Sequence, residues 1–239
     1  MKQNIFEKIE TILKKSMITL GLILLLLTWG LIPIIISSIL KIDYQNMNAI
    51  LKIIISFFND LCLIFILIGI YHKTFFRDFK NYFETGDILE NIFTSLKYWL
   101  LGLSIMVISN SIITIVTNGT LAANEEAVRN LIDTHPLYMA FQLIIYAPLT
   151  EELIFRKSIR EITNNKVIYI LLTGLIFGGM HVISSIQSAK DLLYLIPYCS
   201  LGFTFGYLYT KTDNIFSTIT AHATHNTLAL ILYLTQVMS

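Results

Sequence analysis

Side chains suited to hydrolytic chemistry occur in three short clusters in the C-terminal half of the chain. Each cluster interrupts a strongly apolar run of residues. The clusters are Glu151-Glu152-Leu153-Ile154-Phe155-Arg156, then His181, then His222 with His225 and Asn226. An ionisable group at membrane depth costs several kcal/mol, on the order of 3 kcal/mol by insertion scales, and by default marks a functional site. These clusters are therefore the first candidates for an active site.

The first cluster predicts one paired and one unpaired carboxylate. Glu152 and Arg156 are four residues apart, so on a helix they share a face and can form an ion pair. A neighbouring arginine holds such a carboxylate ionised and fixes its orientation. Glu151 points about 100° away around the helix and stays available as a general base. The alternative is a charge cluster at the membrane interface, continued by Lys157 and Arg160.

The second cluster is a single histidine on a helix face of small residues. Gly174, Gly178 and His181 follow one another at i, i+4 and i+7. A face of small residues lets a neighbouring helix approach closely, which would direct His181 into the helical bundle. Gly202 and Gly206 repeat the spacing, so a tightly packed inner bundle is expected. The alternative is a buried histidine that only bonds to a neighbouring helix.

The third cluster combines two imidazoles with an amide. His222 and Asn226 share a helix face, and His225 lies beside them. An imidazole can polarise a carbonyl or move a proton, and an asparagine amide can donate to an oxyanion. Hydrogen bonding between helices alone would be the alternative. Two further polar residues in apolar runs, Asp60 and Asn110, are expected to have structural partners only.

The composition predicts that these clusters lie inside a membrane. The chain has 239 residues, of which 55% are hydrophobic and only 14% charged, and its mean hydropathy is +0.68. Soluble domains carry roughly 25% charged residues. A disordered chain, a disulfide scaffold and an ordinary soluble domain are excluded, and an all-α, polytopic membrane helical bundle is predicted. Cys62 and Cys199 have no metal or redox spacing, and no basic stripe indicates nucleic-acid binding.

The hydropathy pattern predicts about seven transmembrane helices and three segments of the chain. The expected spans are roughly 17–40, 50–71, 98–117, 136–153, 167–185, 192–210 and 215–236. Residues 1–15 are expected to form an amphipathic helix on the membrane surface. Residues 16–135 would hold the N-terminal transmembrane helices. Residues 136–239 would form the core that carries all three clusters.

The distribution of basic residues predicts the orientation of these spans. With the N-terminus in the cytoplasm, 13 of the 17 lysines and arginines fall in cytoplasmic segments and 4 outside. This agrees with the excess of positive charge on the cytoplasmic side of membrane proteins. The segment with Glu125 and Glu126 then lies outside. A multi-pass protein of a cell membrane, most simply a bacterial cytoplasmic membrane, is expected.

The three clusters, in their order and spacing, resemble the CAAX-protease and bacteriocin-processing family (CPBP, also called Abi). Its motifs EExxxR, FxxxH and HxxxN match Glu151–Arg156, Phe177–His181 and His222–Asn226, and the resemblance extends over about residues 136–236. The resemblance implies an α-helical intramembrane endopeptidase that hydrolyses peptide bonds.

The resemblance also implies the role of each residue. Glu151 would be the base that activates water, with His181 as its partner. Glu152 and Arg156 would form the supporting pair, and His222 with Asn226 would stabilise the oxyanion. His225 is not a motif position, so it is either a bystander or crowds the oxyanion site.

Two questions stay open at this point. The metal-free glutamate mechanism is favoured, but Glu151, His181 and His222 could instead bind Zn²⁺, which lowers the pKa of bound water to about 7. The partners are expected to be the lipid bilayer and a short hydrophobic or membrane-anchored peptide, such as a bacteriocin, a pheromone precursor or a CAAX-like peptide. That peptide is expected to arrive from the membrane or the cytoplasmic side. The alternatives to an enzyme are a non-catalytic bacteriocin self-immunity protein and a proton-coupled transporter.

Overall fold

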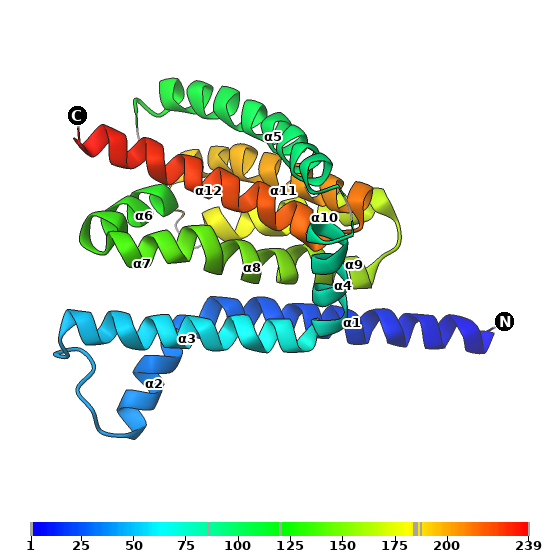
Figure 1. Cartoon of the computed structure of the whole chain (residues 1–239), viewed down its shortest axis with the longest axis horizontal. Helices are drawn as coiled ribbons and strands as arrows, with labels where there is room; N and C mark the ends of the chain where they lie inside the picture. Colours follow the sequence, from blue (N-terminus) through cyan, green and yellow to red (C-terminus); the bar gives the residue numbers. More distant parts are fainter. Residues whose placement is uncertain (1, 86, 120, 184–185, 187, 239) are drawn as a thin grey trace.

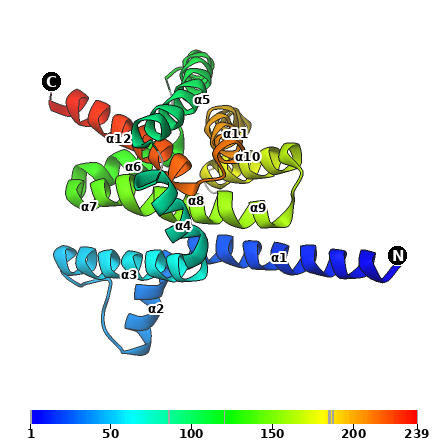
Figure 2. The same cartoon turned by 45° about the vertical axis from the view of Figure 1, so that its right-hand side comes forward.

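The protein is helical throughout the part of the chain that the structure describes. The structure is a computed structural model, and it describes residues 2–85, 87–119, 121–183, 186 and 188–238. Within these ranges every regular element is a helix and there is no strand, so the predicted all-α fold is confirmed. Figures 1 and 2 show two layers, with α1 to α3 on one side of the molecule and α5 to α12 on the other.

In the part of the chain that the structure describes, five helical segments are long and apolar enough to cross a membrane. They are Ile5–Ile39, Ala49–Ile70, Ile88–Val116, Pro136–Ile162 and Ala189–Thr212. The protein is therefore a multi-pass membrane protein. The predicted fifth span corresponds to the shorter apolar helix α10 (Lys166–Val182), and its expected end at 184–185 lies outside the described residues. The predicted seventh span corresponds to α12 (Ile215–Met238), so the count of seven stays a prediction.

The first helix of the N-terminal layer continues across the boundary predicted at residue 15, and the division into segments stays a prediction. Helix α1 runs without a break over Lys2–Thr28, because no glycine or proline interrupts the chain between the basic start and the apolar run. A 3₁₀ turn (Trp29–Leu31) and α2 (Ile32–Ile39) follow, and α3 (Ala49–Ile70) returns beside α1. Trp29 Nε1 donates to the carbonyl oxygen of Asn59 at 2.8 Å and so joins the 3₁₀ turn to α3.

Helix α4 (His72–Phe83) crosses between the two layers and anchors the start of α12. Asp78 is fully buried, and its Oδ2 accepts a hydrogen bond from the backbone N–H of Ile215 at 2.9 Å. This bond satisfies an amide at the first turn of α12 that has no partner inside the helix. Helix α5 (Ile88–Val116) then packs against α11 and α12.

One long helix with two π-helical segments carries the first cluster. It consists of α7 (Pro136–Phe141), η2 (Gln142–Tyr146), α8 (Ala147–Glu152), η3 (Leu153–Ser158) and α9 (Ile159–Ile162), and it follows α6 (Ala123–Thr134). The segments η2 and η3 are π-helical, a geometry that is rare and frequent at functional sites. The helix continues to Ile162, well past the predicted end of this span at 153. Glu151 therefore lies inside the helix rather than at its end.

Helices α10 and α11 (Leu195–Thr212, preceded by a 3₁₀ turn, Ala189–Tyr194) pack closely, as the glycine spacing predicts. A Cβ atom added to Gly202 would lie 2.9 Å from Cα of Gly174, and one added to Gly178 would lie 2.8 Å from the backbone N of Cys199. These backbone atoms cannot move aside for a methyl group unless α10 and α11 move apart. The contact fixes the position of α10 and therefore of His181 at its C-terminal end.

Candidate active site

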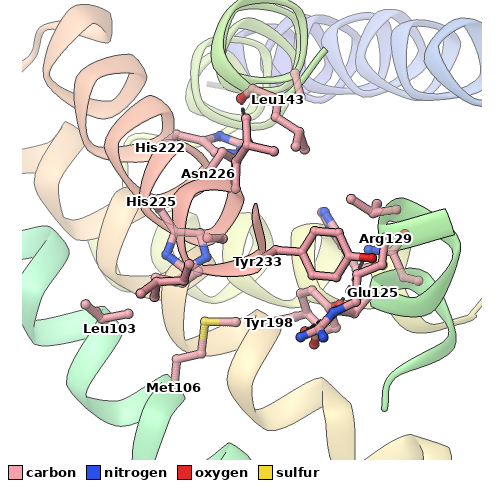
Figure 3. A pocket seen from close by; sticks show the side chains of 18 of the residues that line it. Leu103, Met106, Glu125, Arg129, Leu143, Tyr198, His222, His225, Asn226 and Tyr233 are labelled. Atoms are coloured by element: carbon pink, nitrogen blue, oxygen red, sulfur yellow. Dashed lines mark hydrogen bonds and ion pairs between the residues drawn. The ribbon is translucent and has the colours of Figure 1, made fainter. Parts of the chain in front are cut away.

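All three clusters meet at one cavity of about 520 Å³. Residues from α8, α10 and α12 line it together, and α5, α6 and α11 complete its walls. Figure 3 shows His222, His225 and Asn226 projecting from α12, with Leu103 and Met106 of α5 nearby. The five predicted residues that line the cavity are Glu151, His181, His222, Asn226 and the additional His225. The remaining two, Glu152 and Arg156, lie buried behind its wall.

Glu151 and His181 face each other across a gap. Glu151 Oε2 lies 4.0 Å from His181 Nε2, and both side chains are about one-fifth exposed, 18% and 21%. Among the described residues, Glu151 Oε2 is buried with no hydrogen-bond partner. His181 Nδ1 lies 2.8 Å from the carbonyl oxygen of Phe177, which can only accept, so Nδ1 carries a proton. The other nitrogen, Nε2, is therefore directed toward Glu151.

Glu152 binds both Arg156 and His222, and the sequence indicates only the first of these partners. Arg156 Nε lies 2.9 Å from Glu152 Oε2, and both side chains are fully buried. His222 Nδ1 lies 2.9 Å from Glu152 Oε1. Arg156 Nη1 also donates to Thr173 Oγ1 at 2.7 Å, and its guanidinium stacks 4.8 Å from the centre of the Phe177 ring. Arg156 thus links the helix of the first cluster to α10, and Glu152 links it to α12 and sets the orientation of the His222 ring.

The side chain of Asn226 donates a hydrogen bond to a backbone carbonyl that Pro148 leaves without a donor. In the π-helical register the N–H of Ala147 bonds to the carbonyl of Gln142, five residues earlier. The next residue, Pro148, has no N–H, so the carbonyl of Leu143 lacks its donor. Asn226 Nδ2 donates to that carbonyl oxygen at 2.9 Å, as Figure 3 shows. An asparagine amide has two N–H bonds, so one remains for a molecule in the cavity.

Three further polar residues have distinct environments. Trp99 Nε1 lies 3.5 Å from Nδ1 of His225, a long hydrogen bond between α5 and α12. Asp60 accepts hydrogen bonds from Tyr138 Oη and Gln142 Nε2, and so fastens α3 to the long helix. These bonds join helices, as predicted for Asp60 from the sequence. Asn110 lines the cavity on α5.

The cavity extends to a second polar group that sequence reasoning missed. Arg129 on α6 bonds to Glu125 with Nη2 2.5 Å from Oε1, and its guanidinium lies 5.0 Å from the centre of the Tyr233 ring. Tyr233 in turn donates to Asp133. Figure 3 shows Arg129, Glu125 and Tyr233 together on one side of the cavity. The i, i+4 spacing of Glu125 and Arg129 was the available signal, but nothing in the sequence connects them to the third cluster.

The zinc alternative stays a prediction. Within the described ranges, no group of three or more His, Cys, Asp or Glu side chains is placed so that it could hold a metal ion. Nδ1 of His222 is bound to Glu152 and Nδ1 of His181 to a backbone carbonyl, so Nε2 is the nitrogen that each ring has left for a ligand. The steps proposed below use the side chains of the chain alone.

Two bacterial proteins are similar to this chain. It is 34% identical over 119 residues to the Bacillus subtilis protein named "Putative membrane peptidase YdiL", which covers 48% of this chain and 45% of that protein. It is 28% identical over 159 residues to the UPF0177 protein YxdF of Lactococcus lactis, which covers 62% of this chain and 79% of that protein. The chain thus spans less than half of the length of YdiL. No solved structure matches it at a significant level.

The family comparison covers the cavity-forming half of the chain. The Rce1-like family, described as type II CAAX prenyl endopeptidase Rce1-like, matches residues 133–228. This range contains all three clusters and agrees with the resemblance found in their motifs. Over residues 133–228, which carry all three clusters, the chain is therefore similar to the Rce1-like family of type II CAAX prenyl endopeptidases.

Proposed function

We propose that the protein is an intramembrane endopeptidase in which Glu151 activates a water molecule. One observation carries this proposal: Glu151 Oε2 is buried without a hydrogen-bond partner, 4.0 Å from His181 Nε2, in a cavity inside a membrane protein. An unsatisfied buried carboxylate oxygen is costly and requires an explanation. A water molecule bound to Glu151 would satisfy that oxygen and would be held next to a base.

The reaction is a hydrolysis with a balanced proton transfer. Glu151 takes a proton from water as the water oxygen attacks the carbonyl carbon of the peptide. The π electrons of the carbonyl move to its oxygen and form a tetrahedral oxyanion. When the oxyanion collapses, the C–N bond breaks and the amine leaves with the proton that Glu151 returns. Nε2 of His181, directed at Glu151 by the bond of Nδ1 to Phe177, accepts a hydrogen bond from the same water and so orients the water beside the carboxylate.

The oxyanion is stabilised from α12. Asn226 retains one N–H beside the bond to Leu143. Glu152 holds Nδ1 of His222, so His222 donates to the oxyanion from Nε2 only when both of its ring nitrogens carry a proton. Donors that are already oriented stabilise the developing charge without reorganisation, and one such donor typically contributes about 10²–10³-fold in rate. Glu152 and Arg156 act behind these groups, as a buried pair that fixes His222.

The substrate is proposed to be a short hydrophobic or membrane-anchored peptide. A cavity of about 520 Å³ is in the range of ligand sites, and side chains such as Leu103, Leu201 and Phe205 line it with apolar surface. The cavity extends toward α6, in the segment that the charge distribution predicts outside the cell. Because Glu125 and Arg129 of α6 line the cavity, we propose that the peptide enters from the α6 end.

A cleavage assay tests this function. Purified protein in detergent or liposomes is incubated with a library of short hydrophobic peptides, and wild type is compared with Glu151→Gln, each with and without a zinc chelator. We expect cleavage by the wild type under both conditions and no cleavage by Glu151→Gln. Cleavage that persists in Glu151→Gln would overturn the proposed role of Glu151. Cleavage abolished by the chelator and restored by zinc would overturn the metal-free mechanism.

A further inference from the structure

The cavity contains three histidines, but their partners differ in what they can donate or accept. The partner of His181 Nδ1 is a carbonyl oxygen, and the partner of His222 Nδ1 is a carboxylate held by Arg156. Both partners accept, so Nδ1 is the protonated nitrogen of both rings. In the neutral form, the Nε2 atoms of these two rings are acceptors.

His225 is the exception because its partner is an indole. The N–H of Trp99 can only donate, so Nδ1 of His225 must accept, over a distance of 3.5 Å. A neutral imidazole whose Nδ1 accepts carries its proton on Nε2. Trp99 is buried, at 8% exposure, and reaches His225 from α5. The indole therefore selects the tautomer opposite to that of the other two histidines.

His225 lies in the cavity that holds the proposed catalytic residues. His225 lines the same cavity as Glu151, His181 and His222, and Figure 3 shows it on α12 beside His222 and Asn226. Asn226 already gives one of its two N–H bonds to Leu143. A neutral histidine with its proton on Nε2 can donate to an oxyanion without first being protonated, which His181 and His222 cannot do.

We infer that His225 is a further catalytic residue, whose Nε2–H donates a hydrogen bond to the oxyanion, and that Trp99 is the positioning residue that fixes this tautomer. The inference rests on the proposed peptidase function, since an oxyanion forms only in acyl transfer. It assigns a role to a residue that lies outside the three motifs. It also explains why a third imidazole is kept in an apolar cavity and bonded to an indole.

The tautomer can be measured without a substrate. The full chain is labelled with ¹⁵N-histidine in micelles, and the ring nitrogen signals are assigned with single His→Gln variants. We expect a protonated Nε2 for His225 and a protonated Nδ1 for neutral His181 and His222. Trp99→Phe, which keeps an aromatic ring but lacks the N–H, should move part of the His225 population to the other tautomer. A protonated Nδ1 on His225 in the wild type would overturn the inference.

The donor role is tested on the library peptide that wild type cuts fastest. We expect His225→Leu to lower kcat about 10²-fold with little change in KM, and His225→Gln, which retains an N–H donor, to recover most of that loss. If Glu151→Gln is inactive but His225→Leu keeps the wild-type kcat, the inference fails and the proposed function stands. If Glu151→Gln retains wild-type activity, the proposed function itself fails. Thermal unfolding of each variant verifies that it is folded.

Discussion

Nε2 of His181 lies 4.0 Å from Oε2 of Glu151, although the predicted spans 136–153 and 167–185 would put Glu151 at the cytoplasmic end of one helix and His181 near the outer end of the next. The structure removes the discrepancy because the helix of Glu151 does not end at residue 153 but continues to Ile162. Glu151 is thus enclosed by the bundle, at the level of the C-terminal end of α10. The short distance makes a shared water molecule between the two groups the simplest arrangement.

The buried ion pair of Glu152 and Arg156 should be far more important for stability than the neighbouring exposed one. Arg156→Leu leaves Glu152 as an uncompensated buried charge, and we expect a loss of about 3–5 kcal/mol in the free energy of unfolding. Lys157→Leu, one residue further, breaks the pair with the half-exposed Glu161 and should cost about 1 kcal/mol or less. Thermal unfolding in detergent compares the two variants. Equal losses would contradict this assignment.

The close contact of α10 and α11 should make Gly202 sensitive to a single methyl group. In Gly202→Ala the new Cβ would meet Cα of Gly174 at 2.9 Å, and we expect a destabilisation of about 1–3 kcal/mol with a displaced His181. Gly21 provides the matched control, because a Cβ there meets nothing within 4 Å. Gly21→Ala should be neutral or stabilising by up to about 1 kcal/mol. A Gly202→Ala variant with the wild-type free energy of unfolding would contradict this prediction, because it would show that α10 and α11 can move apart without loss of stability.

The bond from Asn226 to Leu143 should be coupled to Pro148. Asn226→Leu leaves the carbonyl of Leu143 without a donor, which should cost about 1–3 kcal/mol. Pro148→Ala supplies a backbone N–H that can bond to the same carbonyl, so the cost of Asn226→Leu should shrink in that background. A double-mutant cycle of unfolding free energies measures the coupling. Additive effects would contradict the idea that Asn226 replaces the missing amide.

The predicted orientation of the chain can be tested by cysteine labelling. Figure 1 shows α6 and the C-terminal end of α12 at one end of the molecule and α9 at the other, as an alternating path through a membrane requires. In a Cys62→Ser background, a membrane-impermeant maleimide should label Glu126→Cys in intact cells but leave Lys211→Cys unlabelled. Both should react after lysis. Labelling of Lys211→Cys alone in intact cells would invert the orientation.

The sequence predicts which side chains line the candidate site better than it predicts the hydrogen-bond partners of those side chains. Spacing along one helix correctly indicates the pair of Glu152 and Arg156, the close glycine face around Gly178, and the separation of Glu151 from that pair. These relations depend only on helical periodicity. The helical fold and the membrane location follow in the same way from composition and hydropathy.

Contacts between helices could not be predicted from spacing. The bonds of His222 to Glu152 and of Trp99 to His225 join residues from different helices, and their formation depends on how those helices rotate and pack. The π-helical segments beside Glu151 are likewise not predicted from the spacing of residues. Pro148 is a visible signal for one of them, but its consequence, the bond of Asn226 to Leu143, requires the neighbouring helix.

Single-turnover cleavage in H₂¹⁸O tests whether Glu151 directs a water molecule onto the peptide bond. Wild-type enzyme in excess over the best library peptide should place one ¹⁸O atom in the new C-terminal carboxyl group during the first turnover. Glu151→Gln should form product at least about 10³-fold more slowly, while Glu161→Gln, an exposed residue on the same long helix, should match the wild type. First-turnover product without ¹⁸O, or product formed by Glu151→Gln at the wild-type rate, would contradict the account.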